Sequence, residues 1–461
     1  MEEMKVPILP IDMGRYGSHE TKAIFEEEGK LQRLLDVEAA LAWAHAEVGD
    51  IPKEASETIG AMASVKHVRL NRVKEIEAKI RHDIMAVVTA LSEVCGPSGA
   101  YVHLGATSND ITDSATALQL KDALKLISQH LNDLEAVLME LSEANKHVLL
   151  IGRTHGQHAI PMTLGFKFVV WLRETSRHIQ RLEECTDRVV VGKMSGAVGT
   201  QAGLGPNAMK VQHLTMSRLG IMAADVSTQI VQRDRYAELI CLFAIIASSL
   251  DKFAIEIREL QRPEIGELAE PFASATQVGS STMPHKKNPI LCERVCGLAK
   301  ILRSLTIPAL ENVPTWHERD ITQSSAERFI LPEACILLEY MLSLITRVLR
   351  GLHIDREKMR ANVDLTGGRA MSESIMLALT KKGFGRQKAH SLIRDVSLQS
   401  EQDGTPFRDD LLAHPEIRQY LSTREMDEAL NPKNYLGTTL EQIDAMIKKT
   451  ETEREKRVTC H

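Results

Sequence analysis

The sequence predicts an all-α protein built around a central bundle of long helices. Aromatic residues make up only 4% of the 461 residues, which favours helices packed through Leu, Ile, Val and Ala over a β-sandwich. Three stretches carry apolar residues at the spacing of a helix that buries one face, and no alternating strand pattern lies among them. We expect a helical domain at residues 1–110, a long-helix bundle at 111–351 and a smaller helical domain at 352–461.

The N-terminal region is expected to hold one long helix and a shorter helical region. The long helix covers Thr21–Val48 and ends at the Gly49–Pro52 cluster. The shorter region leads to Arg81-His82-Asp83, where another helix begins. Taken alone, this tripeptide also fits a surface ion pair. Cys95–Asp110 is then a loop rich in small polar residues, and its last four residues suit both helix capping and anion binding.

The central region carries the clearest helical signal. A helix expected over Ile111–Lys146 would span about 50 Å at 1.5 Å per residue. Its apolar stripe alternates steps of four and three through Leu120, Leu124, Ile127, Leu131, Leu134, Leu138 and Leu141. Further helices are expected over Leu164–Val189, Tyr236–Ile257, Ile290–Leu305 and Ser325–Arg350. Because these stripes are long and apolar, we expect bundles from several subunits to pack together.

Three loops join these helices. Arg153–Thr163 follows the first long helix, and the Gly- and Ala-rich Ser195–Gly205 follows the second. The latter resembles a phosphate cradle, but no strand is expected before it and no GK[ST] follows it. Gly279–Pro289, GSSTMPHKKNP, contains Gly and Pro residues that are typical of a loop.

Composition excludes several classes of function. The net charge of −6 gives no general attraction to nucleic acid or to anionic membranes, so any anion must be bound by locally clustered Arg and Lys. The first ten residues lack the apolar run of a secretory signal, and the apolar run Leu239–Leu250 is too short to span a membrane. Seven scattered cysteines favour reduced thiols in a cytoplasmic protein. No metal site is expected, because His155 and His158 lack a third ligand.

The loop Gly279–Pro289 resembles the signature of the fumarase/aspartase superfamily, whose members release fumarate from a succinyl group. Over essentially the whole length, the chain further resembles the adenylosuccinate lyases within that superfamily. The matching pieces are Arg15-Tyr16, Arg81-His82-Asp83, HLGATSND at His103–Asp110, RTHGQHA at Arg153–Ala159, Gln229 with QRDR at Gln232–Arg235, Arg294, and WHERDITQSSAER at Trp316–Arg328.

The resemblance implies a fold, an assembly and a reaction. The fold is a three-domain, fumarase-like structure whose bundle packs into a tetrameric helical core, with sites shared between subunits. The reaction is cleavage of adenylosuccinate to AMP and fumarate, in purine nucleotide biosynthesis, together with the parallel cleavage of succinyl-aminoimidazole-carboxamide ribotide. No metal and no organic cofactor is implied; the only ligand is the small nucleotide substrate.

Such an elimination needs a base for a weakly acidic C–H, positive charge around the carboxylates and an acid for the leaving group. Ser280 is the expected base, favoured as an alkoxide by nearby positive charge and N–H dipoles. His155 is the expected acid, because imidazole titrates near neutral pH. A serine hydrolase is disfavoured, since no GxSxG motif is present.

The resemblance also implies roles for binding residues. His82 supports the acid, and His103 binds or orients the substrate. The succinyl carboxylates are held by Lys286 and Asn288, with Thr107, Ser108 and Gln229 helping. The nucleotide and its phosphate are lined by Arg15, Tyr16, Arg81, Asp83, Arg294, Arg319, Ser324 and Arg328.

Two alternatives remain open at this point. One is another enzyme of the superfamily, such as an argininosuccinate lyase or a carboxymuconate cycloisomerase. The other is a non-catalytic structural protein on the same scaffold. A nucleic-acid-binding module is disfavoured, because no basic stripe interleaved with aromatics is present.

Overall fold

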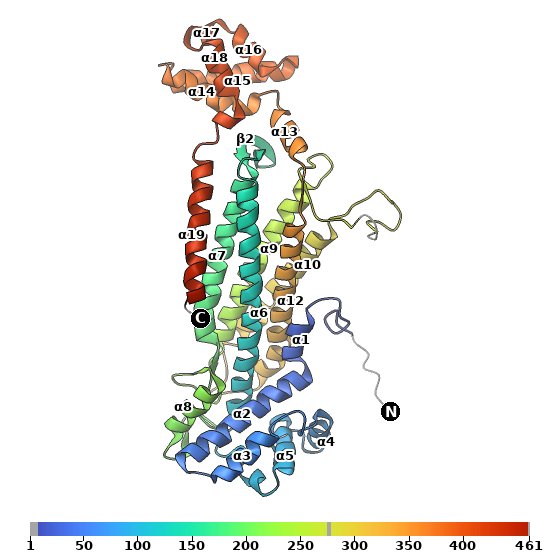
Figure 1. The fold of residues 1–461 in the computed structure, drawn as a ribbon, viewed down its shortest axis with the longest axis vertical. Helices are drawn as coiled ribbons and strands as arrows, with labels where there is room; N and C mark the ends of the chain where they lie inside the picture. Colours follow the sequence, from blue (N-terminus) through green and yellow to red (C-terminus); the bar gives the residue numbers. More distant parts are fainter. Residues whose placement is uncertain (1–7, 274–277, 460–461) are drawn as a thin grey trace. The chain divides into compact units, whose positions relative to one another are not determined.

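The computed structural model describes residues 8–273 and 278–459. The N-terminal stretch 1–10, for which no secretory signal is expected, lies partly outside these described residues. Within the described residues the protein is helical apart from three two-stranded sheets, which confirms the predicted all-α class (Figure 1). The chain forms two compact units. Unit 1 comprises Met1–Asn132, His178–Asp251 and Val295–Leu344, and unit 2 comprises Asp133–Arg177, Lys252–Arg294 and Ile345–His461. The division into three domains stays a prediction.

Five helices are present where three apolar stripes and two shorter helical patterns predict them, and the chain boundaries between the two units fall inside these helices. They are α6 (Ser108–Ala144), α7 (Leu164–Val189), α9 (Asp234–Leu260), α10 (Ile290–Ser304) and α12 (Thr322–Arg350). Every stripe residue of α6 from Leu120 to Leu138 is buried, whereas Leu141 is half-buried. The stripes are therefore core, as periodicity alone predicts.

The helix α12 is apolar as well as long. Among the described residues, it alone has the length and hydropathy that a membrane crossing would need. In the folded protein, however, 72% of its most apolar stretch is buried.

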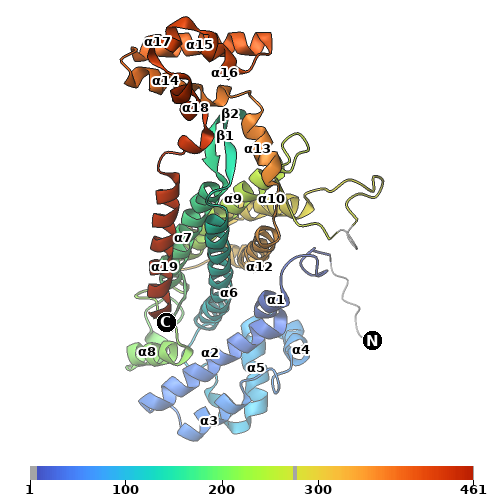
Figure 2. The same ribbon diagram turned by 45° about the horizontal axis from the view of Figure 1, so that its top comes forward.

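The N-terminal helices belong to unit 1, and α2, α3, α4 and α5 lie side by side (Figure 2). They are α1 (His19–Phe25), α2 (Glu27–Val48), α3 (Lys53–Met62), α4 (Leu70–Ile80) and α5 (Asp83–Cys95). The single helix expected over Thr21–Val48 was wrong, because Glu26 adopts an extended conformation with ψ of 162°. The apolar period cannot reveal a break of one residue. The predicted end at Gly49 is confirmed, since this glycine has φ of 85° and caps α2.

Short strands appear where the sequence predicts loops. The antiparallel pair β1 (Leu149–Thr154) and β2 (Gln157–Thr163) replaces the loop expected at Arg153–Thr163. A bulge between Ile151 and Arg153 and a proline in β2 interrupt the alternation that would reveal these strands. A second correction concerns Ser195–Gly205, which is preceded by a strand. The remaining strands are β3 (Val191–Gly192), paired parallel to β4 (Met222–Ala223), and β5 (Leu268–Ala269), paired antiparallel to β6 (His353–Ile354).

The C-terminal helices belong to unit 2, where α14 to α18 gather around an apolar core that includes Phe407, Leu411 and Ile417 (Figure 1). They are α13 (Arg356–Asp364), α14 (Ser372–Lys381), α15 (Arg386–Asp403), α16 (Phe407–Ala413), α17 (Pro415–Tyr420), α18 (Thr423–Leu430) and α19 (Thr439–Thr459). The last helix is bound to the fully buried Glu135 of α6 through Arg454 and Arg457.

The shorter helices connect these elements. They are α8 (Ala208–Leu219) and α11 (Thr306–Glu311), with the 3-10 turns η1 (Gly96–Tyr101), η2 (Ala202–Leu204), η3 (Arg369–Met371) and η4 (Pro432–Asn434).

Candidate active site

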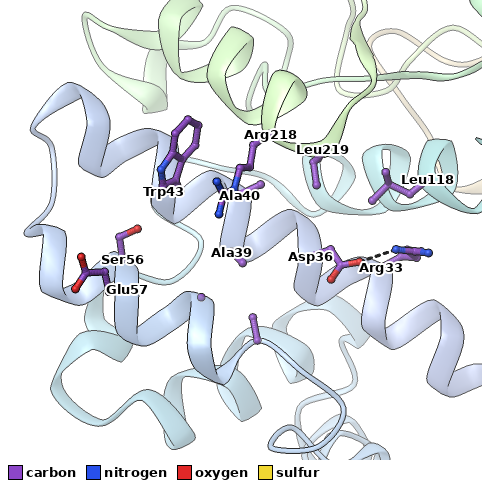
Figure 3. Close-up of a pocket in the computed structure, with 12 residues that line it drawn as sticks. Arg33, Asp36, Ala39, Ala40, Trp43, Ser56, Glu57, Leu118, Arg218 and Leu219 are labelled. Carbon is purple, nitrogen blue, oxygen red and sulfur yellow. Dashed lines mark hydrogen bonds and ion pairs between the residues drawn. The ribbon is translucent and has the colours of Figure 1, made fainter. Parts of the chain in front are cut away.

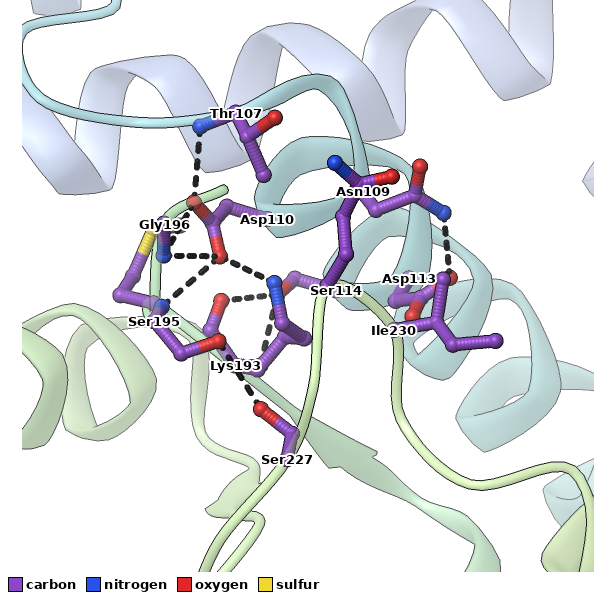
Figure 4. A network of polar contacts seen from close by, with 12 residues as sticks. Thr107, Asn109, Asp110, Asp113, Ser114, Lys193, Ser195, Gly196, Ser227 and Ile230 are labelled. Atoms are coloured by element: carbon purple, nitrogen blue, oxygen red, sulfur yellow. Dashed lines mark hydrogen bonds and ion pairs between the residues drawn. The ribbon is translucent and has the colours of Figure 1, made fainter. Parts of the chain in front are cut away.

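The carboxylate of Asp110 joins two polar segments of unit 1 (Figure 4). Asp110 lies in the first turn of α6 and accepts hydrogen bonds from the backbone N–H groups of Thr107 at 2.8 Å and Ser195 at 2.8 Å. It also accepts the N–H of Gly196 at 3.1 Å and pairs with the ammonium of Lys193. Both side chains of this ion pair are fully buried. The loop before α6 and the segment after β3 are thus held together by one carboxylate.

The same two segments approach each other closely through their backbones. A Cβ atom added at Gly105 would overlap the carbonyl oxygen of Gly203, and Gly105 has φ of 70°. A Cβ at Gly199 would similarly overlap the carbonyl oxygen of Ser227. Within Ser195–Gly205, Gly199 and Gly203 therefore serve close backbone packing. The structure places this loop directly against the segment that carries Thr107 and leads into α6 at Ser108.

A second buried network is centred on Arg233, which precedes α9. Its guanidinium binds Asp113 of α6 through two hydrogen bonds of 3.0 Å and Glu327 of α12 at 2.7 and 3.1 Å. The backbone N–H of Val231 donates to Asp113 at 2.8 Å. Bidentate pairs of this kind define position as well as distance. The network therefore fixes the segment after Gln229 relative to the start of α12, which carries Ser324 and Arg328.

The two carboxylates that bind Arg233 have opposite pKa shifts. Burial alone would raise the pKa of Asp113, but Arg233, the N–H of Val231 and Lys193 hold this pKa below its ordinary value. Burial is also the largest effect on Glu327, and there it keeps the pKa above the ordinary value despite the same arginine. The difference follows from the additional donors around Asp113.

Direct contacts join four of the predicted binding residues of unit 1. Arg319 donates to the side-chain oxygen of Gln229 at 3.1 Å. The guanidinium of Arg328 binds Asp83 at 2.9 Å, with both side chains about half exposed. Arg81-His82-Asp83 therefore takes part in a surface ion pair. The partner of Asp83 is Arg328, which lies in the motif Trp316–Arg328.

His82 and Arg81 form the turn before α5. The Nδ1 of His82 accepts the N–H of Met85 at 3.2 Å and caps the helix, while Arg81 adopts a positive φ of 58°. Tyr16 packs against Tyr340 with ring centroids 5.7 Å apart, and Arg15 is exposed. Thus Tyr16 is anchored to α12, whereas among the described residues no hydrogen bond or ion pair joins Arg15 to another predicted site residue.

His103 lies in a strained corner of the loop before α6. Its φ is 64°, and its Nδ1 lies 2.7 Å from the Oε1 of Glu38 on α2. Burial lowers the pKa of His103, but the hydrogen bond and the charge of Glu38 outweigh it and raise the pKa above its ordinary value. Sequence reasoning missed Glu38, because nothing in a helical stripe distinguishes a buried carboxylate from an exposed one.

In unit 2, His155 occupies the tip of the β1–β2 hairpin. His155 and Gly156 both have positive φ, 52° and 72°, as a two-residue type I′ turn requires. Arg153 in β1 binds the fully buried Glu267 at 2.7 and 2.9 Å, and Asn362 donates to the same carboxylate at 2.8 Å. A rigid hairpin thereby carries an exposed imidazole at its end.

Ser280 lies in the signature loop of unit 2, which we define as residues 278–289. Its Oγ accepts the backbone N–H groups of Thr282 at 3.3 Å and Met283 at 3.1 Å. Asn288 donates to the carbonyl of Gly279 at 2.9 Å and closes the loop, whereas Lys286 is exposed. Two N–H dipoles aimed at a hydroxyl oxygen favour its ionised form. Within the described residues, no hydrogen bond joins Ser280 to His155.

The sequence-predicted residues divide between the two units. Unit 1 holds Arg15, Tyr16, Arg81, His82, Asp83, His103, Thr107, Ser108, Gln229, Arg319, Ser324 and Arg328, and unit 2 holds His155, Ser280, Lys286, Asn288 and Arg294. A cavity of about 620 Å³ between α2, α3 and α8 contains none of them (Figure 3). It is lined instead by residues such as Arg33, Trp43 and Arg218.

Comparison with known proteins identifies the family. A family model described as "Lyase" matches residues 14–302, and one described as "Adenylosuccinate lyase C-terminus" matches residues 368–446. The chain is 52% identical over 440 residues to an adenylosuccinate lyase from Pyrococcus abyssi, covering 95% of this chain and 97% of that one. It is 44% identical to that of Methanocaldococcus jannaschii, with 96% of each chain covered.

Solved structures identify the fold. The fold resembles a fumarate lyase from Mesorhizobium sp. BNC1 with a TM-score of 0.88 and 31% identity, covering 96% of this chain and 100% of that one. It resembles a 3-carboxy-cis,cis-muconate lactonizing enzyme from Pseudomonas putida equally well, with 32% identity and coverage of 96% and 99%. The predicted fumarase-like fold is confirmed, and the chain belongs to the adenylosuccinate lyase family of the fumarase/aspartase superfamily.

Proposed function

We propose that this chain is a carbon–nitrogen lyase that cleaves adenylosuccinate to AMP and fumarate, and succinyl-aminoimidazole-carboxamide ribotide to its carboxamide and fumarate. The observation that carries the proposal is the match to adenylosuccinate lyases over nearly the full length of both chains. The motif residues quoted from the sequence add to it, since they supply a base, an acid and cations for a substrate with two carboxylates and a phosphate.

Ser280 takes the proton from the succinyl carbon next to the carboxylate. Its Oγ already accepts two backbone N–H groups, and these donors stabilise the alkoxide that a serine base requires. Lys286 and Asn288 lie in the same loop and bind the succinyl carboxylates, where negative charge accumulates after proton removal. The electron pair of the C–H bond then expels the purine nitrogen, and fumarate forms.

His155 gives a proton to the departing nitrogen. The hairpin that carries it is tied to Glu267 through Arg153, so the imidazole is presented from a rigid support. A positioned acid or base of this kind contributes about 10²–10⁴-fold to a rate. His82 supports this acid.

The remaining predicted residues bind the substrate. Thr107, Ser108 and Gln229 help to hold the succinyl group, and His103 binds or orients the substrate. The arginines suit carboxylate and phosphate groups because their forked donors bind two oxygens at once. The nucleotide and its phosphate are bound by Arg15, Tyr16, Arg81, Asp83, Arg294, Arg319, Ser324 and Arg328.

We further propose a cytoplasmic homotetramer whose sites combine segments from different subunits. Exposed apolar side chains on the long helices, such as Ile245 and Ile255 of α9 and Ile301 of α10, support an interface there. On dilution below the dissociation constant, the turnover per subunit would fall together with the tetramer fraction. A monomer that retains full turnover would contradict shared sites.

The test of function is a continuous assay of ultraviolet absorbance with adenylosuccinate, using argininosuccinate and a carboxymuconate as control substrates. Only adenylosuccinate and its imidazole counterpart should be converted. Ser280→Ala should bind adenylosuccinate normally in calorimetry and lose about 10²–10⁴-fold in kcat. Retention of substantial activity in Ser280→Ala would remove Ser280 from the role of base, whereas absence of turnover in the wild-type protein would overturn the function itself.

A further inference from the structure

Two side chains of α2 hold the corner of the loop at His103. Glu38 and His45 lie two helical turns apart on α2, and both are buried. The Oε1 of Glu38 lies 2.7 Å from the Nδ1 of His103, and the Nε2 of His45 donates to the carbonyl of Leu104 at 3.1 Å. The backbone at this corner is unusual, because His103 has φ of 64° and Gly105 has φ of 70°. A corner of this kind persists only where its surroundings determine it.

The burial of Glu38 determines the charge of its partner. Its side chain is fully buried, and its Oε2 makes no hydrogen bond within the described residues. A buried carboxylate with one unpartnered oxygen is costly unless a cation lies beside it. The ring of His103 is the group in contact with that carboxylate, so its imidazolium form provides the required charge.

The geometry also determines which ring atom remains for a ligand. Since Nδ1 donates to Glu38, Nε2 is the atom that can reach another molecule. The side chain of His103 is 12% exposed. Two acidic groups act on the ring, Glu38 from α2 and, more weakly, Asp110 from α6, whose own charge is paired with Lys193. Both favour the charged form of the ring.

We propose that Glu38 is a positioning residue for the lyase reaction, which holds His103 so that its Nε2–H binds an anionic group of the substrate. This inference rests on the proposed function. The anionic group is a carboxylate or the phosphate, which share the same acceptor chemistry. Glu38 itself touches no substrate and acts only through His103.

The first experiment measures kcat and KM for adenylosuccinate between pH 6 and pH 9 in the wild type, Glu38→Gln and His103→Asn. In Glu38→Gln, we expect KM to rise about tenfold, because a charge-assisted hydrogen bond becomes a neutral one. The increase of KM with pH should also begin at lower pH, since the ring loses its proton earlier without the carboxylate. The change in kcat should be smaller than that in KM.

The double variant separates positioning from a general structural role. If Glu38 acts through His103, Glu38→Gln should add nothing to the KM of His103→Asn. Glu47→Gln is the matched control, because it removes the same charge from an exposed position of α2, and its kinetics should equal those of the wild type. Additive effects of Glu38→Gln and His103→Asn, or an unchanged pH profile in Glu38→Gln, would overturn the proposal.

A second measurement does not depend on turnover. Histidine ring NMR of protein labelled at the ring carbons, with His103 assigned from His103→Asn, should show a lower titration midpoint in Glu38→Gln than in the wild type. If Glu38→Gln does not fold, His103→Gln serves instead, and its KM should be independent of pH in the range where wild-type KM changes. A wild-type pH dependence in His103→Gln would contradict the proposal. An inactive wild type with the expected His103 titration would contradict only the proposed function.

Product inhibition identifies the anionic group. AMP carries the phosphate and fumarate carries the two carboxylates, so Glu38→Gln should weaken inhibition by one product and leave the other unchanged. Weakened inhibition by AMP assigns Nε2 to the phosphate, and weakened inhibition by fumarate assigns it to a carboxylate. Unchanged inhibition by both products would exclude a contact between His103 and the substrate.

Discussion

Two polar regions of the protein carry family motifs but are built in opposite ways. The networks around Asp110 and Arg233 in unit 1 are buried and joined by several ion pairs and backbone hydrogen bonds. The signature loop of unit 2 is largely exposed, and within the part of the chain that the structure describes, the Ser280 side chain makes short-range hydrogen bonds to its own loop. The first region maintains the geometry of binding segments, whereas the second carries the proposed base. Stability and activity should therefore respond to different substitutions.

The largest effect should come from removing Arg233, the cation shared by the buried Asp113 and the half-buried Glu327. Arg233→Met leaves Asp113 and Glu327 without their cation, and breaking a buried pair in this way costs about 3–5 kcal/mol. Urea unfolding should show this loss. Arg188→Met is the matched control, since Arg188 pairs with Glu238 at an exposed site and its removal should lower the free energy of unfolding far less than removal of Arg233. If Arg233→Met and Arg188→Met lowered the free energy of unfolding equally, the proposed contrast between buried and exposed ion pairs would be wrong.

Lys193→Met should have the next largest effect. It leaves Asp110 buried without its ammonium partner, but the carboxylate keeps the N–H groups of Thr107, Ser195 and Gly196. We therefore expect a loss near the lower end of about 3–5 kcal/mol. Adding Asp110→Asn to Lys193→Met removes the unpaired charge and should recover part of the stability in urea unfolding. A double variant less stable than Lys193→Met would show that the charge of Asp110 is not the cause.

The pH dependence sharpens the same comparison. Because the folded-state pKa of Asp113 is lowered, its contribution is present above the unfolded-state pKa and is lost as pH falls through the folded-state value. The difference in unfolding free energy between wild type and Asp113→Asn should therefore shrink between pH 6 and pH 3. Glu327 has a raised pKa, so its ionisation opposes folding. The wild type should therefore gain stability relative to Glu327→Gln as the pH falls. Parallel trends would contradict the assignment of the two shifts.

A substitution inside the signature loop should lower activity far more than stability. A Cβ atom at Gly279 would overlap the carbonyl oxygen of Lys286 and approach the ring of Phe272 at 3.2 Å. Gly279→Ala should displace Ser280 and Lys286, and a misplacement of about 1 Å is enough to cost about 10²-fold in turnover. Thermal and urea unfolding should change little, because the loop has few buried contacts. A large loss of stability with full activity would contradict this prediction.

The smallest effect is expected for Thr282→Ala. The side chain of Thr282 is exposed, and its contribution to the loop is the backbone N–H bound to Ser280. Alanine keeps that N–H, so the free energy of unfolding should change by less than about 0.5 kcal/mol and kcat should stay near the wild-type value. Urea unfolding measures the free energy of unfolding, and a stopped assay of turnover measures kcat. A large loss of kcat would mean that the threonine hydroxyl acts in the reaction.

The long helices were predictable because their stripes repeat over many turns, and a period read from seven residues, as in α6, outweighs local exceptions. The break at Glu26 and the hairpin around His155 could not be predicted in this way. Each depends on one or two backbone angles that the apolar period does not reveal. The motif residues of the site were found by resemblance. The buried Glu38 and the half-buried Glu327 were missed, because the contacts that remove a charge from solvent join residues distant in sequence.

The discontinuity of unit 1 has a consequence for biosynthesis. Its last piece ends at Leu344, so the ribosome must release most of the polypeptide before this unit can close. Glu327 follows Arg233 by 94 residues, which corresponds to roughly 5–20 s of translation. During that interval the emerging chain exposes apolar helix faces and a guanidinium that lacks one of its two acidic partners. Unit 1 of a nascent chain therefore remains incomplete until α12 has left the exit tunnel.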